Sequence, residues 1–152
     1  MNIPTEEDWL NWPAGVERPM DLDEEYARRR FAGKSFEEAL QLFQTTNVLS
    51  CCEDVSYMPP VPFRYYMLVF KAHVLAEGES KDKWTAPDAA SSFLNLVKQK
   101  LKTEIDSIAP IMKDLLPAIE FVAMNQERYD ADRDIYGDFR EQLARIKSLW
   151  GA

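Results

Sequence analysis

The chain has 152 residues, of which 46% are hydrophobic and 29% are charged, and its formal net charge is −8. This length and composition fit one folded domain with a buried core rather than a disordered chain. The negative charge repels phosphate backbones, which argues against nucleic acid as a partner.

Residues 1–33 are predicted to form an irregular arm, because Pro4, Pro13 and other prolines and glycines interrupt any long helix. The arm is rich in acidic residues, and it also carries Trp9 and Trp12. Indole rings are costly to leave in water. We therefore expect the arm to pack on the helical body or on another copy of the chain, which would make a homo-oligomer.

A helical domain is predicted for residues 34–152. Its first helix opens with a capping box at Ser35 and runs to about Asn47. A second helix follows Pro62 and ends near Gly78, and because it is apolar on almost every side it should lie at the centre of the core. A β-strand over part of this segment is the alternative, but no second strand is evident to pair with it.

Three more helical regions follow. One begins at Thr85 or Asp88 and carries a regular apolar stripe. The next covers residues 105–129 and contains two prolines, so that two shorter helices or one kinked helix are equally compatible with it. The last covers residues 135–149. The fold class predicted is all-α, a single domain of five or six helices in an orthogonal or bundle-like arrangement.

The sequence also predicts the compartment. No run of 18 apolar residues occurs, and the N-terminal residues lack the basic start and apolar stretch of a secretory signal. The two cysteines, Cys51 and Cys52, are adjacent, so they cannot close a long loop in one chain. We expect a cytoplasmic protein with no membrane partner.

The segment 130–141 is the sharpest local motif. An EF-hand calcium loop places oxygen ligands at its positions 1, 3, 5, 9 and 12. Oxygen-bearing side chains occupy the same positions here: Asp130, Asp132, Asp134, Asp138 and Glu141. The position that requires glycine for a sharp turn is Ile135 instead, and the alternative is a solvated turn whose aspartates cap the helices around it. Calcium is therefore the one candidate cofactor.

Catalytic signals are few. His73 is the only histidine, so chemistry that needs an imidazole base must use it, and no nucleophile stands beside it in the sequence. The thiols of Cys51 and Cys52 are followed by Glu53 and Asp54, whose negative charge makes a thiol less reactive. Small core residues are the simpler interpretation of both cysteines.

Aromatic and arginine side chains mark two candidate surfaces for a partner, because these residues dominate interface energies. The candidates are Trp9, Trp12, Tyr57, Arg64 and Tyr65. The function predicted is a non-catalytic, acidic, helical protein-binding module for a basic partner. Bacterial immunity proteins, which are small acidic inhibitors of basic toxins, have this profile of size and charge. The alternatives are a small enzyme that uses His73 or carboxylates, and a calcium-binding helical protein.

Overall fold

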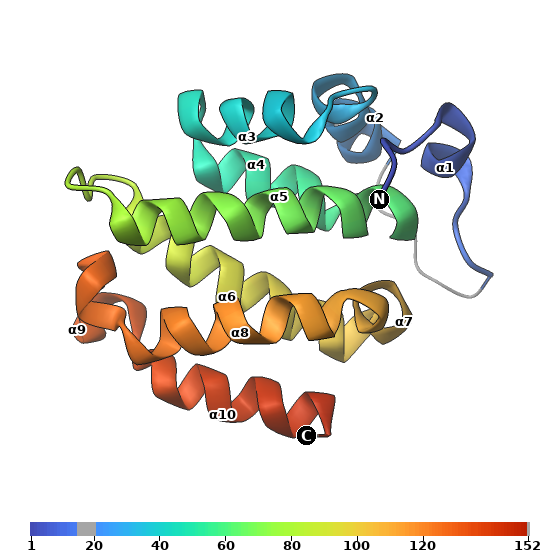
Figure 1. Cartoon of the computed structure of the whole chain (residues 1–152). Coiled ribbons are helices and arrows are strands. Elements are labelled where there is room, and N and C mark those ends of the chain that lie inside the picture. Colours follow the sequence, from blue (N-terminus) through green and yellow to red (C-terminus); the bar gives the residue numbers. More distant parts are fainter. Residues whose placement is uncertain (15–20, 152) are drawn as a thin grey trace.

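The helix α5 (Pro60–Glu79) runs through the middle of the computed structural model, which describes residues 1–14 and 21–151 (Figure 1). Prolines stand in its first turn, where a backbone N–H has no partner within the helix. Its buried side chains point in all directions, because other helices cover it on both sides. Sequence analysis predicted this central helix, and the structure confirms it over the segment for which a strand was the alternative.

The described residues form no strand and contain eight α-helices of five or more residues, packed as one compact domain. Five or six helices were predicted, so the number was too low. Besides α5 these are α1 (Glu6–Leu10), α2 (Asp21–Phe31), α3 (Phe36–Thr45), α4 (Val48–Ser56), α6 (Ala86–Thr103), α8 (Met112–Met124) and α10 (Phe139–Trp150). Two four-residue helices, α7 (Ile105–Ile108) and α9 (Arg133–Tyr136), complete the set. None of these helices combines the length and the apolarity that crossing a bilayer requires.

Two predicted helix boundaries depend on particular residues. The capping box at the start of α3 is present, because the Ser35 hydroxyl accepts from the Glu38 amide at 3.2 Å and the Glu38 carboxylate accepts from the Ser35 amide at 3.0 Å. The region 105–129 is broken rather than kinked. Pro110 lies in a short 3₁₀ turn between α7 and α8, whereas Pro117 is accommodated inside α8.

The segment predicted as an irregular arm contains two helices, α1 and α2, and it packs on the body of the same chain. Trp9 on α1 is only 1% exposed, and its ring centroid lies 6.1 Å from that of Tyr66 on α5. The Tyr66 hydroxyl donates to the carbonyl groups of Phe31 and Lys34, at 2.8 and 2.9 Å. These bonds fasten the end of α2 to α5. Residues 15–20 of the predicted arm lie outside the described residues.

Candidate functional site

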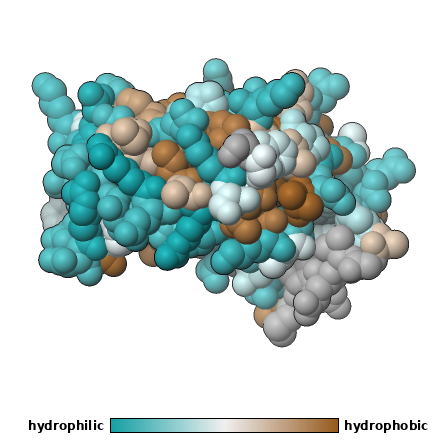
Figure 2. All heavy atoms as spheres, turned by 90° about the horizontal axis from the view of Figure 1, so that it is seen from below, coloured by the Kyte–Doolittle hydropathy of each residue, from teal (hydrophilic) through white to brown (hydrophobic). Residues whose placement is uncertain are grey.

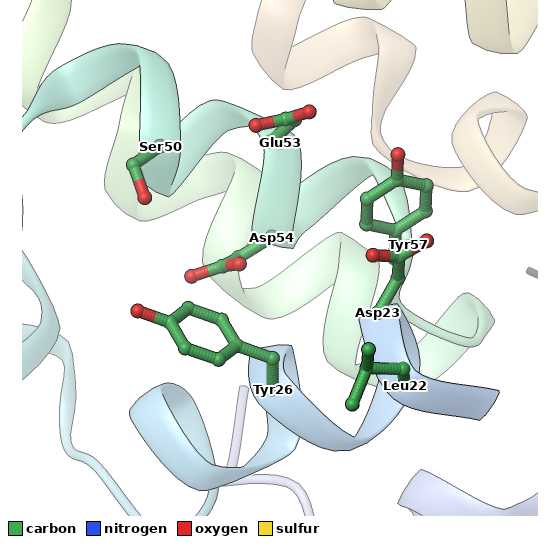
Figure 3. Close-up of a pocket in the computed structure, with 7 residues that line it drawn as sticks. All are labelled: Leu22, Asp23, Tyr26, Ser50, Glu53, Asp54 and Tyr57. Carbon is green, nitrogen blue, oxygen red and sulfur yellow. The ribbon is translucent and has the colours of Figure 1, made fainter. Parts of the chain in front are cut away.

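The helices α2 and α4 pack against each other in the upper part of Figure 1, and a cleft of about 220 Å³ lies between them. Side chains from both helices line it, as Figure 3 shows: Leu22, Asp23, Tyr26, Ser50, Glu53, Asp54 and Tyr57. Each helix contributes residues three or four positions apart, the spacing that places side chains on one helical face. We call this set of residues the acidic cleft.

Arg30 on α2 fixes the distance between the two helices. Its guanidinium donates to the hydroxyl of Ser50 at 2.7 Å, to the sulfur of Cys51 at 3.1 Å and to the hydroxyl of Thr46 at 3.2 Å. The first turn of α4 is itself held by Asn47, whose side-chain oxygen accepts from two backbone amides of that turn. The acidic cleft is therefore formed by elements that hydrogen bonds hold in place.

Asp54 forms the floor of the acidic cleft. It is only 4% exposed, and its Oδ2 atom lies 3.2 Å from the Arg30 Nε atom. This contact is an ion pair without the angle of a hydrogen bond, since Oδ2 has no hydrogen-bond partner among the described residues. Burial and, to a smaller extent, the Glu53 carboxylate raise the pKa of the Asp54 carboxyl to about 6, against the opposing effect of Arg30.

The rim of the acidic cleft combines negative charge with exposed aromatic surface. Tyr26 is 53% exposed, and the Arg30 guanidinium lies 5.6 Å from the centre of its ring. Burial raises the pKa of the Tyr57 hydroxyl, and the carboxylates of Asp23 and Glu53 raise it further. Three carboxylates, those of Asp23, Glu53 and Asp54, line the cleft, and the Asp54 carboxylate pairs with Arg30. The arrangement suits a cation, because carboxylates pair with it and aromatic faces attract it.

The raised pKa of Asp54 predicts how stability depends on pH. The folded pKa of about 6 exceeds the unfolded value of 3.8, so the protonated carboxyl favours the fold below pH 4 and this contribution is lost as pH rises to about 6. Relative to an Asp54→Asn variant, the protein should lose about 2 kcal/mol of unfolding free energy between pH 4 and pH 7. Denaturant titrations of both proteins at each pH measure the difference. Parallel pH profiles would contradict the shift.

Two of the aromatic residues predicted to meet a partner lie on the N-terminal segment. Trp9 is buried in the core, so it stabilises the fold and presents no surface to a partner, which corrects the prediction for this residue. Trp12 is half-buried, and its indole N–H donates to the Glu24 carboxylate at 3.0 Å. The structure does not bring Trp12 into the lining of the acidic cleft.

The other three predicted partner residues lie on or next to α5. Tyr57 is half-buried and lines the acidic cleft, and its contact with a partner stays a prediction. Tyr65 is buried against Tyr66 and is not available at the surface, a second correction. Arg64 is half-buried and donates to the carbonyl of Ser107 at 3.3 Å, so it ties α5 to α7.

The segment 130–141 consists of two short turns on either side of α9, followed by the start of α10. Asp132 caps α9 by accepting from the Asp134 amide at 2.8 Å, and Asp138 caps α10 by accepting from the Arg140 amide at 2.9 Å. This matches the alternative in which aspartates cap the neighbouring helices. The described part of the chain contains no group of three or more acidic, histidine or cysteine side chains placed to hold a metal ion, and the calcium hypothesis for Asp130, Asp132, Asp134, Asp138 and Glu141 finds no support there.

Gln126 holds this segment together instead. Its amide nitrogen donates to the carbonyl groups of Ala131 and Gly137 at 2.9 and 2.7 Å, and its oxygen accepts from the Phe139 amide at 2.9 Å. The side chain is buried, and Gly137 adopts a positive φ of 78° at the turn. The sharp turn is thus made by Gly137, two positions after the residue where a calcium loop would need it.

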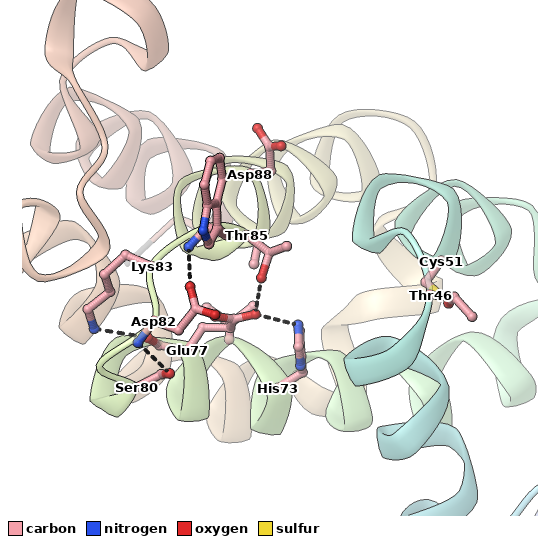
Figure 4. Close-up of polar contacts among 12 residues, drawn as sticks. Thr46, Cys51, His73, Glu77, Ser80, Asp82, Lys83, Thr85 and Asp88 are labelled. Atoms are coloured by element: carbon pink, nitrogen blue, oxygen red, sulfur yellow. Dashed lines mark hydrogen bonds and ion pairs between the residues drawn. The ribbon is translucent and has the colours of Figure 1, made fainter.

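His73 lies on α5 beside a hollow of about 230 Å³ that Gln44, Ala76, Glu77 and Ser80 also line. The imidazole is 3% exposed, and its Nε2 atom lies 3.3 Å from the Glu77 carboxylate (Figure 4). That carboxylate accepts in turn from the Thr85 hydroxyl at 2.5 Å. Burial lowers the pKa of His73, while Glu77 opposes the change.

This order of groups does not suit acyl transfer. A nucleophilic triad requires the imidazole between the hydroxyl and the carboxylate, so that the imidazole can take the hydroxyl proton. Here the Glu77 carboxylate stands between Thr85 and His73. Stacking of the imidazole on the Phe43 ring, with centroids 5.6 Å apart, assigns His73 to the packing of α3 on α5.

Neither cysteine forms a disulfide in the described structure. Cys51 is buried and contacts Arg30 and Thr46, and burial raises the pKa of its thiol. Burial also raises the pKa of Cys52 to about 12. A thiol with a raised pKa is a poor nucleophile and a poor metal ligand, so both residues behave as small core side chains.

Sequence reasoning missed most of the acidic cleft. Glu53 and Asp54 were considered only as neighbours of the two cysteines, and neither Asp23 nor Tyr26 was singled out. The sequence did contain a signal for the helix α4, because Asn47 is a good helix cap and the apolar residues of 48–55 follow a helical spacing. Comparison of the chain with protein-family models, with curated proteins and with solved structures finds no match. The site is therefore interpreted from its own geometry.

Proposed function

We propose that the protein is a non-catalytic binding module whose acidic cleft receives a lysine or arginine side chain of a basic protein partner. The observation that supports this function is a single cleft lined by three carboxylates, those of Asp23, Glu53 and Asp54, together with the rings of Tyr26 and Tyr57. A basic toxin whose cationic surface is covered by the module is one such partner.

The chemistry of the acidic cleft favours a long cationic side chain. Carboxylates form charge-assisted hydrogen bonds with a guanidinium or an ammonium group. An exposed aromatic face such as that of Tyr26 adds roughly 0.5–1 kcal/mol through a cation–π contact. Leu22 is exposed beside it and offers apolar surface to the methylene stem of the ligand.

The charge of the whole chain supports the same partner class. A net charge of −8 raises the association rate of a basic protein, more strongly at low salt than at high salt. Binding of a cation should also depend on pH, because the pKa of Asp54 is raised and a bound cation favours the ionised carboxyl. Partner binding should then release a proton near pH 6.

The experiment measures calorimetric binding of a peptide rich in arginine and lysine to the wild type and to an Asp23→Asn/Glu53→Gln variant. Removing two carboxylates that contact the cation should weaken binding at least tenfold, since each charged hydrogen bond contributes about 1.5–3 kcal/mol. A peptide of the same length rich in glutamate should not bind.

The matched control carries the same change of charge at exposed sites elsewhere, as Glu37→Gln/Asp106→Asn. It should weaken binding by less than about threefold at physiological salt, because distant surface charges are screened there. Equal losses in the two variants would mean that only total charge matters, and the proposed site would be abandoned.

A further inference from the structure

A second hollow, of about 340 Å³, lies between the last turns of α6 and α10. In Figure 1, α10 forms the lower edge of the molecule, whereas α2 and α4 lie in its upper part. The hollow is lined by Lys98 and Lys102 from α6 and by Arg145, Ser148 and Leu149 from α10. We call these five residues the basic hollow.

The cations of the basic hollow have no acidic partner in the described structure. The side chains of Lys102 and Arg145 make neither an ion pair nor a hydrogen bond with any described residue. The Lys98 ammonium donates to the amide oxygen of Gln142 at 2.7 Å, which fixes its position without neutralising it. Three unpaired positive charges therefore converge on the surface of a protein whose net charge is −8.

This convergence has an electrostatic cost. Burial lowers the pKa of Lys98, and the positive charges of Arg145 and Lys102 lower it further. The dipole of α6 favours a cation in its last turn, which accounts for Lys102 alone. It does not account for the approach of Arg145 from a different helix. A bound anion would relieve the repulsion among all three cations.

Apolar surface adjoins these charges. Figure 2 views the molecule from the α10 side, and hydrophobic residues gather in the middle of this face with hydrophilic residues around them. Leu149 lines the basic hollow directly, and Leu143 and Trp150 of the same helix are only half-buried. A ligand of this site can therefore bury an apolar group next to its anionic group.

We infer that the basic hollow binds a ligand in which a phosphate group is attached to an apolar portion. Three cations match a dianionic phosphate better than a single carboxylate, and the Ser148 hydroxyl supplies a further donor. The phosphate lies among Lys98, Lys102 and Arg145, and the apolar portion packs on Leu149. This site is separate from the acidic cleft and does not depend on the function proposed for it.

The test is a titration of the full chain, followed by NMR chemical shifts, with phenyl phosphate, inorganic phosphate and benzoate as three separate probes. Phenyl phosphate should bind most tightly, inorganic phosphate more weakly and benzoate most weakly, with shifts concentrated in residues 98–102 and 142–149. Arg145→Ala should weaken phenyl phosphate binding about tenfold, because it removes one charged hydrogen-bond partner.

Lys113→Ala is the matched control, since Lys113 is an exposed lysine on α8. It should leave the affinity for phenyl phosphate unchanged. Equal affinities for phenyl phosphate and inorganic phosphate would show that the apolar portion of the ligand does not contribute to binding. An affinity that is insensitive to both Arg145→Ala and Lys102→Ala, or no binding up to about 10 mM of any probe, would overturn the site itself.

Discussion

Replacing Arg30 by alanine is expected to lower the free energy of unfolding by about 3 kcal/mol, because it leaves the buried Asp54 carboxyl without its cation. The same change also removes the hydrogen bonds that tie α2 to Ser50, Thr46 and Cys51 on the other side of the acidic cleft. Denaturant unfolding at pH 7 measures the loss.

Arg29→Ala is the control for this variant. Arg29 forms an ion pair with Glu25 at 2.6 Å on the same helix, but both side chains are largely exposed, so its removal should change stability by less than about 0.5 kcal/mol. Combining Arg30→Ala with Asp54→Asn should cost less than Arg30→Ala alone, since no unpaired carboxyl remains. Equal losses for Arg29→Ala and Arg30→Ala would contradict the role assigned to Arg30.

Gln126→Ala is expected to be equally damaging, at about 3 kcal/mol, because three backbone groups lose their partner together. Backbone amides of residues 131–139 should then exchange with solvent faster than those of α5. Gln99→Ala, at an exposed position of α6, should have almost no effect. A Gln126→Ala variant of unchanged stability, with unchanged amide exchange in residues 131–139, would show that this segment does not depend on the Gln126 side chain.

The parts of the fold that could be predicted are those with a local cause. The capping box at Ser35 and the proline-led start of α5 depend on residues only a few positions apart. The capping box was identified correctly, and the start of α5 was predicted at Pro62, two residues after its position at Pro60. The helix α2 was missed for a physical reason. Only a few of its side chains, such as those of Ala27 and Phe31, are fully buried. Most of the helix is charged, so its sequence shows too few apolar residues at helical spacing to indicate an amphipathic helix.

The candidate site depends on pairs that are distant in the sequence. Arg30 meets Asp54 only because α2 and α4 pack side by side, and 24 positions separate the two residues. No local pattern encodes such a contact. The sequence also cannot distinguish aromatic residues of the core from those of the surface. Trp9 and Tyr65 are buried in the structure, whereas Tyr57 lines the acidic cleft. Composition alone predicted the negative net charge, but it did not predict which acidic residues line the cleft.

Binding of a basic partner at the acidic cleft can be tested directly by NMR mapping of the arginine- and lysine-rich peptide on the full chain at physiological salt. We expect the largest shift changes in residues 22–26 and 50–57, the two segments that line the acidic cleft. Largest changes in the acidic segment 130–141, or changes spread evenly over the acidic surface, would contradict it.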